Sequence, residues 1–252
     1  MPGISGFEMG MQFREHADRL GAEFAEGFVS GLEKEGDIWK VCTEKEVYKA
    51  KAVILAAGAT HRHLGVPGEQ ELTGRGVSYC ATCDGAFFRN KVTAVVGGGD
   101  VAVEDAIFLA RSCEKVYLIH RRDELRAARS LQKQLFALPN VEILYHHTVQ
   151  EICGAQKVEK LVLRDLEAQT DRELAADGVF IAVGITPQTE SFAGVADMDE
   201  GGYLIAGEDC VTTTPGIFAA GDIRTKKLRQ IVTAVADGAN AVTSVEYYLR
   251  SL

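Results

Sequence analysis

The sequence lacks any long apolar run and any excess of positive charge. Its 252 residues include 27 Lys and Arg against 36 Asp and Glu, which gives a formal net charge of −9. A negative surface repels nucleic acids and anionic lipids, so we expect neither as a partner. No apolar run reaches the roughly 20 residues that a membrane helix needs, and no signal-peptide pattern precedes the first predicted helix. These absences predict a cytoplasmic globular protein with one large core or two small ones.

Cysteine is scarce apart from one close pair. Cys80 and Cys83 form a C-x-x-C motif that Asp84 follows directly. The remaining cysteines stand alone and far apart: Cys42, Cys113, Cys153 and Cys210. A zinc site would need two more ligands at matching spacing, and a structural disulfide across so short a loop removes little chain entropy. Since C-x-x-C pairs often contain a thiol of lowered pKa, the motif favours a redox-active disulfide over these two alternatives.

A glycine turn comes shortly after the cysteine pair. The apolar segment 92–96 predicts a strand, and it leads into Gly97, Gly98, Gly99, Asp100 and, two residues on, Ala102. In a dinucleotide site Gly97 would allow the tight turn and Gly99 would let a pyrophosphate approach the backbone. Ala102 would be the third small residue, which lets helix and strand pack closely. A helix predicted over 100–113 would direct its N-terminus at the phosphates. The alternative is a glycine turn without a ligand.

The next predicted strand, 116–119, ends in cations instead of an acid. They are His120, Arg121, Arg122 and, one turn later, Arg126. An NAD site usually has an acid here for the ribose 2′-hydroxyl, whereas cations accept a 2′-phosphate. The pattern therefore favours NADP(H). Asp123 leaves NAD open, and a solvated loop is a further alternative.

These segments together resemble the bacterial-type, low-molecular-weight thioredoxin reductases. The resemblance covers nearly the whole chain and includes residues 76–85, 97–102, 120–126, 184–187, 216–222 and 229–231. It implies an α/β fold with two Rossmann-like, three-layer nucleotide-binding domains. The NADPH domain, expected at 88–211, would be inserted into an FAD domain formed by 1–87 and 212–252, with the cysteine pair at the border between them.

The resemblance also implies a role for each site residue. Cys83 would face the flavin, Cys80 would attack the disulfide of thioredoxin, and Asp84 would exchange protons with the thiols. The FAD contacts would be Gly58, Gly221, Asp222, Arg229, Gln230 and Ile231, with Ala57 where the family usually has Thr. NADPH would reduce the flavin, the flavin would reduce the cysteine pair, and the dithiol would reduce thioredoxin. The family is usually homodimeric.

The first residues depart from the family pattern. Family members begin with a strand and a G-x-G-x-x-G turn that holds the FAD pyrophosphate, and roughly fifty to sixty residues of that kind have no counterpart here. Gly3, Gly6 and Gly10 follow no apolar strand. We therefore expect these 252 residues to purify without FAD or to lose it on dialysis, and to lack thioredoxin reductase activity. Two alternatives stay open: a flavin-free NADP-binding module, and a related flavin disulfide reductase with another partner.

Periodicity predicts the remaining elements. Ser5 and Glu8 form a capping box for a helix that Gly21 ends. Residues 38–42 and 47–50 suggest a hairpin, and 53–56 a buried strand. Beyond the glycine turn we expect a helix over 123–137 and strands near 141–145, 158–166 and 179–183. The last helix carries an apolar stripe interpreted as a packed core face: Val232, Val235, Ala239, Val242 and Leu249. Hinges are expected at 87–91 and 209–214.

Overall fold

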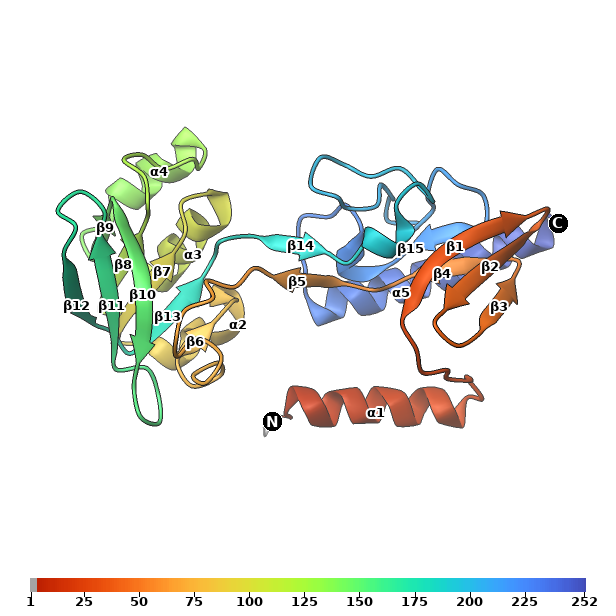
Figure 1. The fold of residues 1–252 in the computed structure, drawn as a ribbon, viewed down its shortest axis with the longest axis horizontal. Helices are drawn as coiled ribbons and strands as arrows, with labels where there is room; N and C mark the ends of the chain where they lie inside the picture. Colours follow the sequence, from red (N-terminus) through yellow and green to blue (C-terminus); the bar gives the residue numbers. More distant parts are fainter. Residues whose placement is uncertain (1–3) are drawn as a thin grey trace. The chain divides into compact units, whose positions relative to one another are not determined.

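The computed structural model describes residues 4–252. They divide into two compact units (Figure 1). Unit 1 comprises the residues up to Ala57 together with Gln188–Leu252, and unit 2 comprises Gly58–Pro187. These borders differ from the predicted ones at 87/88 and 211/212. Strand β6 (Val77–Ser78) pairs within the sheet of unit 2, whereas Phe192 and Leu204 are buried in the core of unit 1.

Unit 2 is built on a five-stranded parallel sheet. The strand order is β6, β13 (Gly178–Ile181), β7 (Val92–Val96), β8 (Lys115–Ile119) and β9 (Val141–Leu144). Every neighbouring pair is parallel. Helix α3 (Asp100–Ala110) follows β7, and helix α4 (Arg129–Phe136) follows β8. Because both sheet faces are covered, the central strands are almost continuously apolar, which is why the sequence showed them clearly.

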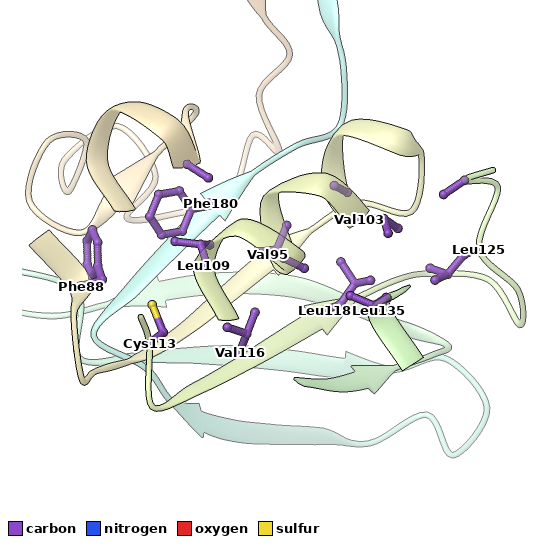
Figure 2. Packing of buried hydrophobic residues seen from close by; sticks show 14 residues of the cluster. Phe88, Val95, Val103, Leu109, Cys113, Val116, Leu118, Leu125, Leu135 and Phe180 are labelled. Atoms are coloured by element: carbon purple, nitrogen blue, oxygen red, sulfur yellow. The ribbon is translucent and has the colours of Figure 1, made fainter. Parts of the chain in front are cut away.

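The two faces of this sheet pack against different layers. Val95, Leu118 and Phe180 pack with Val103 and Leu109 of α3 (Figure 2). The alternate strand residues, including Ala94, Val96 and Ile119, pack with a second sheet, of antiparallel strands. That sheet consists of β10 (His147–Cys153), β11 (Lys160–Asp165) and β12 (Asp171–Ala175). Alternation of side chains along each strand thus produces three layers.

Several predicted elements of unit 2 need correction. The helix predicted over 123–137 begins only at Arg129. The preceding loop is held by the glycine turn instead, since Arg126 N donates to Gly98 O (2.7 Å) and Ala128 N donates to Asp100 Oδ1 (2.7 Å). Strands β10 and β12 were not predicted. Unit 2 also contains a two-stranded antiparallel ribbon, formed by β5 (Ala59–His61) and β14 (Ile185–Pro187).

Unit 1 has smaller sheets. Strands β1 (Val29–Glu35), β2 (Ile38–Thr43) and β3 (Val47–Ala50) form an antiparallel sheet. Strands β2 and β3 form the predicted hairpin, whereas β1 was not predicted. Strand β4 (Val53–Leu55) pairs in parallel with β15 (Ile217–Ala219). The core gathers Trp39, Leu55, Phe192, Leu204, Ile217 and Ile223.

The two long helices of unit 1 bury little apolar surface. Helix α1 (Gly6–Arg19) has the predicted capping box, with Glu8 N donating to Ser5 Oγ (3.2 Å), but none of its residues is buried. Helix α5 (Ile231–Arg250) buries Asp237 and Ala241. The predicted packed stripe is therefore wrong: Val232 is 71% exposed, and Val235 and Val242 are exposed too. The buried face of α5 instead carries Asp237 and Ala241, and Ala241 packs with Cys210 and Ala220. None of the helices described is both long and apolar enough to cross a membrane.

The interior of unit 2 predicts a clear stability difference. Phe180 is fully buried and meets Phe88 edge to face, with ring centroids 5.2 Å apart (Figure 2). Phe180→Ala should lower the free energy of unfolding by about 3–5 kcal/mol, because it leaves a cavity in a close-packed core. Phe136→Ala, at a 60% exposed position, should change it by less than about 0.5 kcal/mol. Urea unfolding of both variants checks this, and equal losses would contradict it.

Candidate active site

The cysteine pair lies at the start of a short helix in unit 2. Cys80 and Cys83 form a disulfide with their Cα atoms 5.3 Å apart. Cys80 is the N-cap of α2 (Ala81–Asp84), and Cys83 N donates to Cys80 Sγ (3.2 Å). Cys83 is exposed and Cys80 is partly buried. Residues 4–252 contain no group of three or more His, Cys, Asp and Glu side chains that could hold a metal ion.

The acid beside the disulfide has a partner that the sequence analysis missed. Ser78 Oγ donates to Asp84 Oδ2 (2.7 Å) and accepts a hydrogen bond from Cys80 N (3.1 Å). Ser78 is only 5% exposed. The one available sequence signal was a hydroxyl residue two positions before Cys80. One hydroxyl thus connects the first cysteine's backbone to the acid.

A cavity of about 590 Å³ opens at the carboxyl ends of β7 and β8. Of the predicted nucleotide residues, five line it: Gly97, Gly98, His120, Arg121 and Arg126. The others, Gly99, Asp100, Ala102 and Arg122, lie outside its lining. Arg62, His63, His147 and Gln150 also line it and were missed, because they come from segments distant in sequence. Carboxyl ends of parallel strands are where α/β folds bind nucleotides.

Each glycine of the turn at 97–99 is required for a different structural reason. Gly97 has φ +154°, and a Cβ there would lie 2.4 Å from Ala182 O. A Cβ on Gly98 would lie 2.2 Å from Cε1 of His120. At Gly99 a Cβ would meet nothing within 4 Å, so this position faces open space. The first two glycines let the turn pack, and the third leaves room for a ligand to approach the backbone.

His120 is a buried, neutral ring at this cavity. Burial lowers its pKa, and the guanidinium groups of Arg126, Arg122 and Arg121 lower it further. Its Nε2 atom is buried without a hydrogen-bond partner among the residues that the structure describes. An unsatisfied buried nitrogen costs free energy, so it is suited to a polar ligand.

A buried carboxylate ties the cavity wall to the redox centre. Glu69 accepts hydrogen bonds from Leu64 N (3.1 Å), Gly65 N (2.7 Å) and the Tyr79 hydroxyl (2.8 Å). Burial by itself would raise the pKa of Glu69, but the hydrogen bonds from Tyr79, Gly65, Leu64 and His63 outweigh it and lower the pKa. Burial and the Glu69 carboxylate raise the pKa of Tyr79 to about 12. Glu69 thus holds both the loop at Leu64 and Gly65, beside the cavity, and Tyr79, the residue before Cys80.

The predicted flavin residues fall in both units. Gly58 lies in unit 2, whereas Gly221, Asp222, Arg229, Gln230 and Ile231 lie in unit 1. Arg229 Nε donates to Asp222 O (3.4 Å). The Oδ1 atom of Asp222 is buried and has no hydrogen-bond partner within the described chain. An orphaned carboxylate oxygen beside a glycine at φ +78° fits the hydroxyl-rich part of a flavin nucleotide.

Asp237 holds this glycine turn in place. Its carboxylate accepts from Gly221 N (2.8 Å), from Arg224 Nε (2.8 Å) and Nη2 (2.6 Å), and from Lys226 Nζ (2.8 Å). Burial would raise the pKa of Asp237, but the hydrogen bonds from Arg224, Lys226 and Gly221 outweigh it and lower the pKa to about 2. No sequence motif marks Asp237, Arg224 or Lys226, so this network was not predicted.

The Asp237 network predicts a pH-dependent stability. The pKa falls from 3.8 in the unfolded chain to about 2, so ionised Asp237 contributes about 2 kcal/mol above pH 4. That contribution should be lost as the pH falls from about 4 to about 2. In Asp237→Asn the thermal midpoint should be lower at pH 7, and the difference from wild type should shrink in acid. The exposed pair Arg14–Asp18 provides a control, since Asp18→Asn should change little. A constant difference at every pH would contradict the assignment.

Comparison with known proteins identifies the family. Residues 4–238 match the model of the pyridine nucleotide-disulphide oxidoreductases. The thioredoxin reductase of Bacillus subtilis is 46% identical over 250 residues, which cover 99% of this chain and 79% of the relative. That of Peptoclostridium acidaminophilum is 45% identical over 246 residues, covering 95% and 78%. The crystal structure of thioredoxin reductase from Streptococcus pyogenes superposes with a TM-score of 0.95 at 45% identity, covering 100% of this chain and 84% of that one. The chain belongs to the pyridine nucleotide-disulphide oxidoreductase family and is similar to its thioredoxin reductases.

Proposed function

We propose that the protein reduces the disulfide of thioredoxin with electrons from NADPH, through bound FAD and the Cys80–Cys83 pair. The observation that carries this is a disulfide at the head of α2 in the same unit as a cationic cavity behind a glycine turn. The relatives named thioredoxin reductase support it over nearly the whole chain. We assign NADPH to unit 2 and FAD mainly to unit 1.

The nucleotide cavity supports NADPH through its charge. The turn at Gly97–Gly99 would hold the pyrophosphate by backbone N–H groups. The 2′-phosphate would pair first with Arg121 and Arg126, which line the cavity, and Arg122 would contribute less because it lies outside the lining. The buried Nε2 of His120 is available to a further polar atom of the nucleotide.

FAD, when bound, would accept a hydride from NADPH and pass two electrons to a disulfide. In unit 1, Asp222 would accept hydrogen bonds from the flavin's hydroxyl chain, and Arg229, Gln230 and Ile231 would lie along its ring. Asp237 keeps the Gly221 turn in the conformation that presents Asp222.

The dithiol then exchanges with the partner's disulfide. The Cys80 thiolate attacks one sulfur of thioredoxin, forms a mixed disulfide and expels one thiol. Cys83 then attacks Cys80, which restores the Cys80–Cys83 bond and releases the second thiol. Two electrons pass to thioredoxin, and Asp84 would exchange a proton in the process. We place the protein in a reducing compartment, the cytoplasm, because four further cysteines are free, and we expect a homodimer as in the family.

The charge of the cavity predicts a preference between nucleotides. NADP⁺ should bind at least about tenfold more tightly than NAD⁺, or about 1.4 kcal/mol, because Arg121 and Arg126 pair with the 2′-phosphate. Arg121→Ala should remove most of this preference and leave NAD⁺ affinity nearly unchanged. Arg122→Ala is the matched control and should have a smaller effect. Calorimetric titration measures the six affinities of the three proteins for the two nucleotides, and equal binding of the two nucleotides by the wild type would overturn the assignment.

The flavin assignment predicts colour and turnover together. A polypeptide of these 252 residues should lose FAD on dialysis, because no strand within residues 4–252 is followed by a G-x-G-x-x-G turn. Fusing a segment with that turn from a thioredoxin reductase relative should give yellow protein and NADPH-dependent thioredoxin reduction. In the fusion, Cys83→Ser should keep the colour and abolish turnover. A yellow fusion that reduces other disulfide proteins but not thioredoxin would refute the proposed partner.

A further inference from the structure

We propose that Ser78 is a positioning residue for the redox centre: its hydroxyl fixes the orientation in which Asp84 exchanges protons with the dithiol. The inference rests on the proposed role of Asp84. It adds a residue that acts on proton exchange through the acid, by the hydrogen bonds that its hydroxyl forms with Asp84 and with Cys80 N.

Ser78 is held from two sides. It is the last residue of β6 and lies opposite Phe180 in the parallel sheet, so its backbone position is set by the sheet. Ser78 is 5% exposed, and its hydroxyl bonds to Asp84, the last residue of α2. A residue with so little freedom can impose an orientation on a neighbour at small entropic cost.

The single hydroxyl proton has one good acceptor. Asp84 Oδ2 lies 2.7 Å from Ser78 Oγ, whereas the alternative acceptor, Cys80 O, lies 3.4 Å away. The shorter bond goes to a carboxylate, which makes it the stronger of the two. The oxygen's lone pair meanwhile accepts from Cys80 N at 3.1 Å. Ser78 therefore links the acid to the backbone of the first cysteine.

Asp84 has other directions open to it. It is only partly buried, and it lines a cavity of about 260 Å³ together with Lys91 and Lys157. Ser78 lines the same cavity beside the acid. The two ammonium groups would attract a carboxylate that was free to turn. The bond from Ser78 thus selects one orientation of the Asp84 carboxylate.

The test uses the dithiol alone, so that it does not depend on flavin or nucleotide. The protein is reduced with a phosphine, freed of it, and mixed with 2-hydroxyethyl disulfide. Cys80 attacks the probe and expels one thiol; Cys83 then attacks Cys80 and expels the second. Two electrons move from the protein to the probe, and the two protein thiol protons end on the released thiols. Acid quenching and mass spectrometry give the rate.

A double-mutant cycle separates positioning from a merely structural role. Ser78→Ala and Asp84→Asn should each slow the reaction by about tenfold, and the double variant should be no slower than Asp84→Asn. Ser78→Thr, which keeps the hydroxyl, should recover part of the rate. Thr93→Val, which removes another buried hydroxyl of unit 2, should leave the rate unchanged.

Three outcomes would overturn the proposal. They are an unchanged rate in Ser78→Ala, multiplied effects in the double variant, or an equal loss in Thr93→Val. If Ser78→Ala does not fold, Ser78→Cys replaces it in the cycle, because a thiol of similar size is a much weaker hydrogen-bond donor than a hydroxyl. Repeating the wild-type assay with oxidised thioredoxin tests the proposed function separately. Reaction with the small disulfide but not with thioredoxin would reject that function while the cycle still decides the role of Ser78.

Discussion

The carboxyl ends of the parallel strands in unit 2 are the constraint on which the candidate site depends. Parallel pairing places the ends of neighbouring strands along one edge of the sheet. The redox disulfide follows β6, the glycine turn follows β7, and the cationic segment follows β8. Ala182, whose carbonyl forbids a side chain at Gly97, follows β13. Chemistry encoded in four distant segments is thus brought to a common edge by backbone pairing alone.

Buried carboxylates then fix the loops that the sheet leaves irregular. Glu69 accepts hydrogen bonds from the backbone at Gly65 and from the Tyr79 hydroxyl, and Asp237 accepts one from the backbone of Gly221. A buried charge is costly unless hydrogen bonds surround it, and both groups are fully surrounded. Because removing either carboxylate would leave several donors unsatisfied, each one specifies a single loop conformation.

The sequence predicted the parts of the fold that local pattern controls. Strand β7, its glycine turn and β8 were found because a fully buried parallel strand is apolar throughout and glycines mark the turn. The start of α4 was placed too early, because the tie between Arg126 and Gly98 is tertiary. Strand β12 was missed, since Asp171, Arg172 and Glu173 give it no strand-like composition. The face of α5 was assigned wrongly, because periodicity cannot tell a buried stripe from an exposed one.

The site residues likewise divide into those that a local sequence pattern predicts and those that only the structure shows. Motifs located the cysteines, the glycines and the arginines, whose spacing along the chain is itself the signal. Ser78, Glu69 and Asp237 carry no such signal, because each acts through hydrogen bonds to residues that only folding brings near. The structure also separates motif residues that the sequence pattern treats alike, since Arg121 lines the cavity and its neighbour Arg122 does not.

This division of parts also explains why the proposed reaction needs both units. Unit 2 holds the cavity proposed for NADPH and the disulfide. A nicotinamide delivers a hydride, whereas a disulfide is opened by an electron pair that expels a thiolate. A carrier has to convert one into the other. The orphaned oxygen of Asp222 and the turn locked by Asp237 belong to unit 1, so the residues suited to that carrier are supplied by the other half of the chain. Electron transfer from NADPH to thioredoxin is therefore a property of the whole chain, although unit 2 carries its two ends.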